Sequence, residues 1–190
     1  MKKLMTMMAV LALAITSNAA SINWTVSGLA SKVVNDKAGS PAANETVYLI
    51  LAGTSDLASI TDCADAAKFN SALSAITLDS GTTTSEGKKP SISNKVVTND
   101  ALTANTTYTF GLLYVCEDAK GDGYYKVVTA SAPAYTTGDT ANAKTLSTSF
   151  ANLESASWTK AYSAPAPIPE PATGALALAG VALLFRRRRA

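Results

Sequence analysis

The sequence predicts a mainly β fold, an antiparallel β-sandwich of immunoglobulin-like size with one short helix near residues 60–78. Residues 20–164 contain 20 Thr and 18 Ser, a composition that favours strands and turns over helices. In the same stretch, short runs of β-branched and aromatic residues recur between Gly, Pro, Asn, Asp or Ser residues. The Cys-Trp-Cys spacing of true immunoglobulin domains is absent from the sequence.

Five such runs are the predicted strands. The last two are joined by the turn-forming stretch 118–123 and therefore form a predicted hairpin. The longest run is apolar on both faces, which is typical of a strand in the centre of a sheet. The runs are INWTVS at 22–27, TVYLILA at 46–52, NKVVT at 94–98, TYTFGLLYVCE at 107–117 and YYKVVTA at 124–130.

One helix is predicted to begin after Ser59, because Ser59 and Asp62 have the spacing of a capping box. The stretch 79–81, Asp-Ser-Gly, should end it. Between these limits, apolar residues recur at helical spacing, so that one face should pack on the sheet. These residues are Ala66, Phe69, Leu73 and Ile76.

The absence of histidine restricts the chemistry that the chain can perform. Without imidazole, neither a Ser-His-Asp triad nor a Cys-His pair nor a His-bearing zinc site is available. The Gly-rich phosphate motifs GxxxxGK[ST] and GxGxxG are also absent from the sequence. We therefore predict no catalytic residue, no cofactor and no metal ligand, and expect no enzymatic activity.

The net charge of +2 is unevenly divided along the chain. Residues 1–19 carry a charge of +2 and residues 165–190 a charge of +3, whereas residues 20–164 carry −3. A mildly acidic body therefore lies between two short basic ends. A nucleic-acid-binding domain would need a concentrated basic face, so we predict no nucleic-acid partner.

The first 19 residues have the pattern of a secretory signal peptide. Lys2 and Lys3 precede an apolar run, and small residues follow it. Small side chains at Ser17 and Ala19 suit the cleavage site, which predicts cleavage after Ala19, with Ala20 as the neighbouring alternative. Residues 20–162 are then the exported β-rich domain.

The C-terminal end has three consecutive parts. Residues 163–171 form a Pro-rich spacer, and residues 172–185 form an apolar run that is predicted to be a separate helix and a short transmembrane segment. Residues 186–190 form a basic tail that should stay in the cytoplasm and stop transfer. The four residues that carry this charge are Arg186, Arg187, Arg188 and Arg189.

The order of these parts resembles the PEP-CTERM protein-sorting signal of Gram-negative bacteria. The resemblance covers residues 167–190, with Pro169, Glu170 and Pro171 as the motif, together with the signal peptide. It implies that the tail is a substrate of exosortase, a membrane-embedded cysteine transpeptidase-like enzyme. It also implies an exported protein of the kind often associated with exopolysaccharide, and it says nothing about the body's activity.

The two cysteines, Cys63 and Cys116, are predicted to point inward in an exported protein. A disulfide between them is therefore expected, with two buried thiols as the alternative. The bridge would close a long loop and stabilise the fold by about 4 kcal/mol.

Together these features predict a non-enzymatic exported protein. Its partners would be the Sec translocon, signal peptidase, exosortase and exopolysaccharide, and its precursor would be anchored in the membrane. The mature form should be retained in the cell envelope or the extracellular matrix. One alternative is a carbohydrate-binding or adhesive module, suggested by Trp24, Tyr124, Tyr125, Tyr135 and Trp158. The other is a simple C-terminally anchored surface protein.

Overall fold

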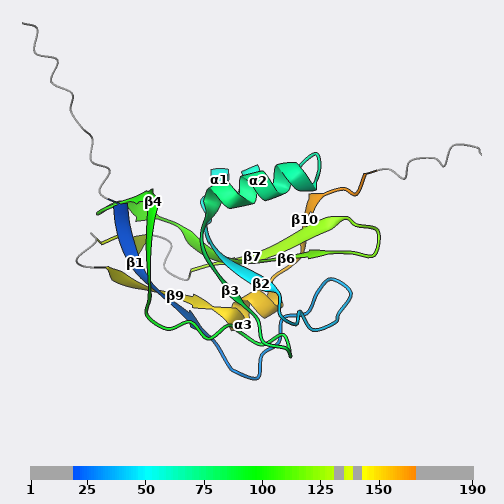
Figure 1. The fold of residues 1–190 in the computed structure, drawn as a ribbon, viewed down its shortest axis with the longest axis horizontal. Helices are drawn as coiled ribbons and strands as arrows, with labels where there is room; N and C mark the ends of the chain where they lie inside the picture. Colours follow the sequence, from blue (N-terminus) through cyan, green and yellow to red (C-terminus); the bar gives the residue numbers. More distant parts are fainter. Residues whose placement is uncertain (1–18, 131–134, 139–142, 166–190) are drawn as a thin grey trace, which may run out of the picture.

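The structure is a computed structural model that describes residues 19–130, 135–138 and 143–165, and this part of the chain is mainly β, as predicted (Figure 1). It contains ten strands and three short helices. In chain order they are β1 (Ala19–Ser27), β2 (Thr46–Leu51), α1 (Thr54–Ser59), α2 (Ala66–Ile76), β3 (Thr77–Thr82), β4 (Lys95–Thr103), β5 (Thr107–Tyr108), β6 (Phe110–Glu117), β7 (Gly123–Thr129), β8 (Tyr135–Thr136), β9 (Lys144–Ser149), α3 (Phe150–Ser155) and β10 (Thr159–Tyr162).

The strands form two main sheets and one small one. The larger sheet has five strands in the order β10-β7-β6-β2-β3, and all its neighbours are antiparallel. The second sheet has the order β4-β1-β9, in which β1 pairs antiparallel with β4 but parallel with β9. β5 and β8 form a separate two-stranded ladder.

A core between the two main sheets draws side chains from both. Ile22 and Trp24 of β1 lie against Leu49 of β2 and Leu112 of β6, and all four are fully buried. A buried indole needs an acceptor for its N–H group. Trp24 Nε1 donates to Thr148 Oγ1 at 3.1 Å and so ties β1 to β9.

A second core lies on the other face of the five-stranded sheet, where α2 covers it (Figure 1). Phe69, Leu73 and Ile76 of α2 are buried against a cluster that includes Ile50 and Leu113. The predicted apolar stripe of the helix is therefore confirmed. β6 lies between β7 and β2 with apolar residues on both faces, which confirms its predicted place inside the sheet.

The start of the predicted helix is wrong. Ser59 is the last residue of a different helix, α1, and Asp62 has a left-handed φ of 49° between the two helices. The cap of α2 is Asp65, whose carboxylate accepts a hydrogen bond from Lys68 N at 2.8 Å. An N-cap aspartate satisfies a backbone N–H that has no partner within the helix, so Asp65 fixes the first turn.

Two other boundaries differ from the predictions. The stretch 79–81, expected to end the helix, lies inside β3. The predicted strand 107–117 is divided, because Thr107 and Tyr108 pair with β8 while β6 begins at Phe110. The hairpin is confirmed, since β6 pairs antiparallel with β7 across the turn at residues 118–122.

The predicted signal-peptide run and the predicted C-terminal helix at 172–185 lie outside the described residues. Within the ranges that the structure describes, no helix is long and apolar enough to cross a membrane.

Candidate functional site

The two alternative signal-cleavage residues lie at the start of β1. Ala20 is fully buried and faces Asn99 of β4 in the ladder. The register shifts between Ala19 and Ala20, so the regular pairing begins at Ala20. The sorting motif Pro169, Glu170 and Pro171 and the stop-transfer residues Arg186, Arg187, Arg188 and Arg189 lie outside the described residues.

The chain leaves the domain beside the turn between β6 and β7. There the Asp122 carboxylate accepts hydrogen bonds from Ala164 N at 2.7 Å and from Lys160 Nζ at 3.1 Å. These two bonds hold the pKa of Asp122 below its usual value. Pro169 lies five residue steps after Ala164, and a fully extended chain of that length spans at most about 18 Å.

The expected disulfide is absent, because Cys63 and Cys116 are both free thiols. The two residues lie on opposite faces of the five-stranded sheet. Cys116 of β6 packs against the core between the sheets, whereas Cys63 packs against the core beneath α2. Cys63 also lies at the sheet edge, where its N–H donates to Ala161 O at 2.7 Å. The structure does not contain the predicted bridge, because the two inward-facing cysteines face different interiors.

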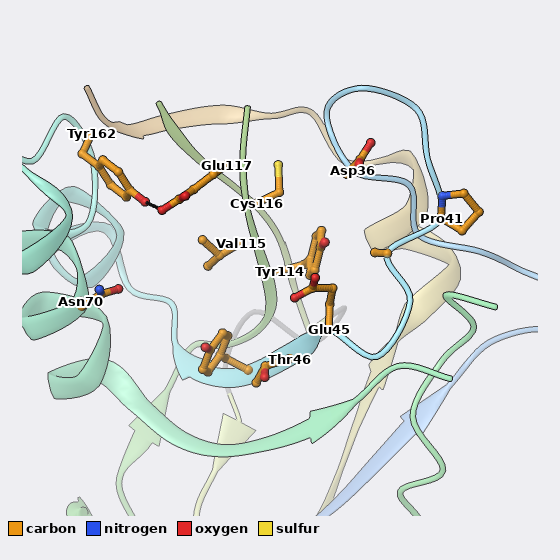
Figure 2. A pocket seen from close by; sticks show the side chains of 12 residues that line it. Asp36, Pro41, Glu45, Thr46, Asn70, Tyr114, Val115, Cys116, Glu117 and Tyr162 are labelled. Carbon is orange, nitrogen blue, oxygen red and sulfur yellow. Dashed lines mark hydrogen bonds between the residues drawn. The ribbon is translucent and has the colours of Figure 1, made fainter. Parts of the chain in front are cut away.

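A cleft of about 500 Å³ opens beside the ends of β2 and β6 (Figure 2). Its floor is β6, one wall is the loop 36–45, and the other wall comes from α2 and β10. Tyrosines and carboxylates account for half of its lining. The lining residues are Asp36, Pro41, Ala42, Glu45, Thr46, Tyr48, Asn70, Tyr114, Val115, Cys116, Glu117 and Tyr162.

One end of the cleft is closed by Tyr162 and Glu117. The Tyr162 hydroxyl donates a short hydrogen bond to Glu117 Oε1, drawn as a dashed line in Figure 2. The Tyr162 ring is 5% exposed and packs on Phe69 with 5.5 Å between ring centroids. Burial and the neighbouring Glu117 carboxylate raise the pKa of Tyr162 above its usual value.

Tyr114 lies toward the other end, where Figure 2 shows it beside Glu45 and below Asp36. Its side chain is 2% exposed, and its ring packs edge-on against Trp158 with 5.7 Å between centroids. Burial raises the pKa of Tyr114, and the negative charge of Glu45 raises it further. Its hydroxyl has no hydrogen-bond partner among the residues that the structure describes.

Cys116 lines the same end of the cleft. Burial raises the pKa of its thiol, and the hydrogen bond from Lys37 N only partly opposes this effect. A thiol with a raised pKa is mostly protonated at neutral pH and is a weak nucleophile. Cys116 therefore contributes a small, soft surface to the cleft and no activated nucleophile.

The nearby lysines are engaged with aromatic rings outside the lining. Lys126 is 3% exposed, lies 4.6 Å from the Trp158 ring centroid and donates from Nζ to Asn35 O at 3.1 Å. Lys37 Nζ lies 3.2 Å from the centroid of the Tyr124 ring. The polar surface inside the cleft consequently consists of carboxylates, hydroxyls and the amide of Asn70.

The aromatic residues that the sequence suggested as sugar platforms do not form one surface. Trp24 is fully buried, and Tyr125 is 4% exposed with its hydroxyl 2.7 Å from Thr61 Oγ1. Trp158 packs on Tyr114, and the ring of Tyr135 packs on Phe110. The tyrosines that line the cleft were missed because they come from three separate strands, and only the fold brings them together.

The described residues contain no group of three or more His, Cys, Asp or Glu side chains that could hold a metal ion. What the cleft offers is hydrogen-bond acceptors, negative charge and aromatic faces, which suit a polar or cationic ligand.

No protein-family profile, curated protein or solved structure matches the chain.

Proposed function

We propose that the chain is a non-enzymatic exported bacterial protein that carries a PEP-CTERM sorting signal. The observation that carries this proposal is the pair of terminal sequences. A signal peptide stands at residues 1–19, and the Pro-Glu-Pro motif, a short apolar segment and four arginines follow one another at the C-terminus. Each pattern alone occurs in many proteins, whereas both on one chain define a single export route.

In this proposal, the Sec translocon exports the chain, and signal peptidase removes residues 1–19. The apolar segment 172–185 then holds the precursor in the membrane with Arg186 to Arg189 in the cytoplasm. Exosortase processes the tail at or near Pro169, Glu170 and Pro171. The mature protein remains in the cell envelope or in the extracellular polysaccharide matrix.

The position of the chain exit supports this route. Asp122 fixes Ala164 beside the β6–β7 turn, and the motif follows within about 18 Å of chain. The turn is therefore the membrane-proximal end of the domain in the proposed precursor. An enzyme that acts on the motif must approach this end.

The fold that we propose for the exported domain is a β-sandwich of immunoglobulin-like size. Support comes from the core that the five-stranded and three-stranded sheets share. The parallel pairing of β1 with β9 distinguishes its topology from a purely antiparallel sandwich.

The proposal is tested by fractionating host cells that express the wild type or a variant in which Pro169, Glu170 and Pro171 are all replaced by Ala. The wild type should be processed and leave the inner membrane, whereas the variant should accumulate there as the precursor. Pro165→Ala, which lies outside the segment that resembles the sorting signal, is the matched control and should behave as the wild type. Equal processing of the triple variant would exclude the sorting signal, and an unprocessed wild type would indicate a simple anchored surface protein.

A second candidate function is carbohydrate binding by the domain, and the cleft is the observation that favours it. Carboxylate and amide groups beside tyrosine rings are suited to sugar hydroxyls and sugar faces. Glycan-array binding by the wild type that is lost in Tyr48→Ala would support this function. Absence of binding to every neutral glycan on the array would remove it.

A further inference from the structure

The end of the cleft around Asp36 and Glu45 presents two carboxylates, and Lys126 is close enough to Asp36 for their charges to interact. Neither residue forms an ion pair with any described residue, and no lysine or arginine lines the cleft. One Asp36 oxygen accepts a hydrogen bond from Ser40 N at 2.8 Å, which orients the side chain. This end of the cleft is therefore a preformed acceptor for a positively charged group.

The Tyr114 hydroxyl provides a second, independent indication of a ligand. Tyr114 is 2% exposed and lines the cleft, yet its hydroxyl has no hydrogen-bond partner in the described part of the chain. The hydroxyl is free to form a hydrogen bond with a molecule that enters the cleft, and a ligand that reaches it there would also contact Glu45.

The opposite end of the cleft holds a third carboxylate, that of Glu117. Glu117 uses Oε1 to accept from Tyr162, and its other oxygen is left for a ligand. Figure 2 shows Glu117 on one side of the cleft and Asp36 with Glu45 on the other, with Val115 and Tyr114 between them. Two acceptor ends with an apolar and aromatic middle fit a molecule that has positive charges at a distance from each other.

We infer that the cleft binds an organic cation that carries primary amines. One ammonium group donates to Asp36, Glu45 and the Tyr114 oxygen, and the body of the ligand lies over Val115. A second ammonium group donates to Glu117. A single metal ion does not fit, because the described acidic and cysteine side chains do not form a group that could hold one.

Primary amines of this kind occur in linear polyamines and in deacetylated amino sugars, and the probes separate the two. Isothermal titration calorimetry on the full-length chain in detergent uses spermidine and a glucosamine trimer. The neutral counterparts are 1,4-butanediol and the N-acetylglucosamine trimer, which keep similar skeletons without the charge. Binding to either amine should weaken as salt rises, because both partners carry charge.

The variants Glu45→Gln and Asp36→Asn remove charge and keep shape, and Tyr114→Phe removes only the hydroxyl. Each should weaken amine binding about tenfold or more, since each removes a hydrogen bond to a charged group. Asp100→Asn is the matched control, because Asp100 is exposed on β4 and its replacement removes the same charge outside the cleft. The Asp100→Asn variant should bind the amines with the affinity of the wild type.

Tighter binding of spermidine indicates a polyamine ligand, and tighter binding of the glucosamine trimer indicates an amino-sugar polymer. Three results would overturn the inference: neither amine binds, the neutral counterparts bind as tightly, or all three cleft variants bind like the wild type. Circular dichroism of each variant shows that a loss of binding is not a loss of fold.

Discussion

Replacing Gly123 by Ala should destabilise the protein by displacing Tyr162. An added Cβ would overlap the Tyr162 ring, at 2.6 Å from Cδ1 and closer still to Cε1 and Cζ. The ring has no free space, because it is 5% exposed and packs on Phe69. Gly123 is consequently required for close approach between β7 and β10.

The size of the effect follows from what the displaced ring loses. The aromatic pair with Phe69 contributes about 0.5–1.5 kcal/mol. The hydrogen bond from Tyr162 to the Glu117 carboxylate contributes about 1.5–3 kcal/mol, and burial of the ring a similar amount. A small shift of β10 can restore part of these lost interactions. The free energy of unfolding should therefore fall by about 3–6 kcal/mol.

Urea denaturation followed by circular dichroism measures this loss, and a double-mutant cycle assigns it. In the Tyr162→Ala background no ring is left to displace, so adding Gly123→Ala should cost less than about 1 kcal/mol. The Tyr162→Phe variant isolates the share of the hydroxyl. A loss below about 1 kcal/mol for Gly123→Ala alone, or strict additivity in the cycle, would show that Gly123 is not needed to make room for the Tyr162 ring.

Three further predictions concern processing, the thiols and alkaline pH. The mature protein should begin at Ala20, because cleavage one residue later would remove Ala20, which is fully buried and pairs with β4. N-terminal sequencing of the mature protein checks this prediction. A mature protein that begins at Ser21 would contradict it. Thiol titration of the denatured protein without reductant should detect two reactive thiols, those of Cys63 and Cys116. Detection of no reactive thiol would show that the two cysteines form the disulfide after all. Burial raises the pKa of Tyr135 to about 12 and also raises those of Tyr114 and Tyr162. The unfolded chain ionises tyrosine near pH 10, so the free energy of unfolding should fall as pH rises from about 10 to 12. Ultraviolet titration should show ionisation of these tyrosines only as the protein unfolds, and normal ionisation of all seven in the folded state would contradict it.

The elements that the sequence predicted well are those whose apolar pattern is strong. The alternation of Leu112 and Leu113 between two cores placed β6 inside the sheet, and the stripe at Phe69, Leu73 and Ile76 placed α2 on it. Large apolar side chains are buried in the folded protein, so their spacing along the chain indicates the type of element and the face that it turns inward.

The elements that were missed have little apolar content. β9 reads Lys-Thr-Leu-Ser-Thr-Ser, and only its partnership with β1 makes it a strand. β10 and β3 are similarly short and polar, and both lie at sheet edges. Their place in the sheets depends on contacts distant in sequence, which local propensity does not contain.

The cleft could not be predicted for a related reason. Asp36, Tyr48, Tyr114 and Tyr162 are far apart in the chain, and no spacing connects them. Alternation along a strand indicates that a side chain is inward-facing but does not say which core it faces. The same ambiguity underlies the predicted disulfide, which the structure does not contain.

The most direct test of the proposed function is the intact mass of the protein recovered from its native host. The mature species should begin at Ala20 and lack residues 186–189, because in the proposed route both ends serve export and sorting and are then removed. A mature species that keeps Arg186 to Arg189 would contradict processing of the tail and leave a simple membrane-anchored protein.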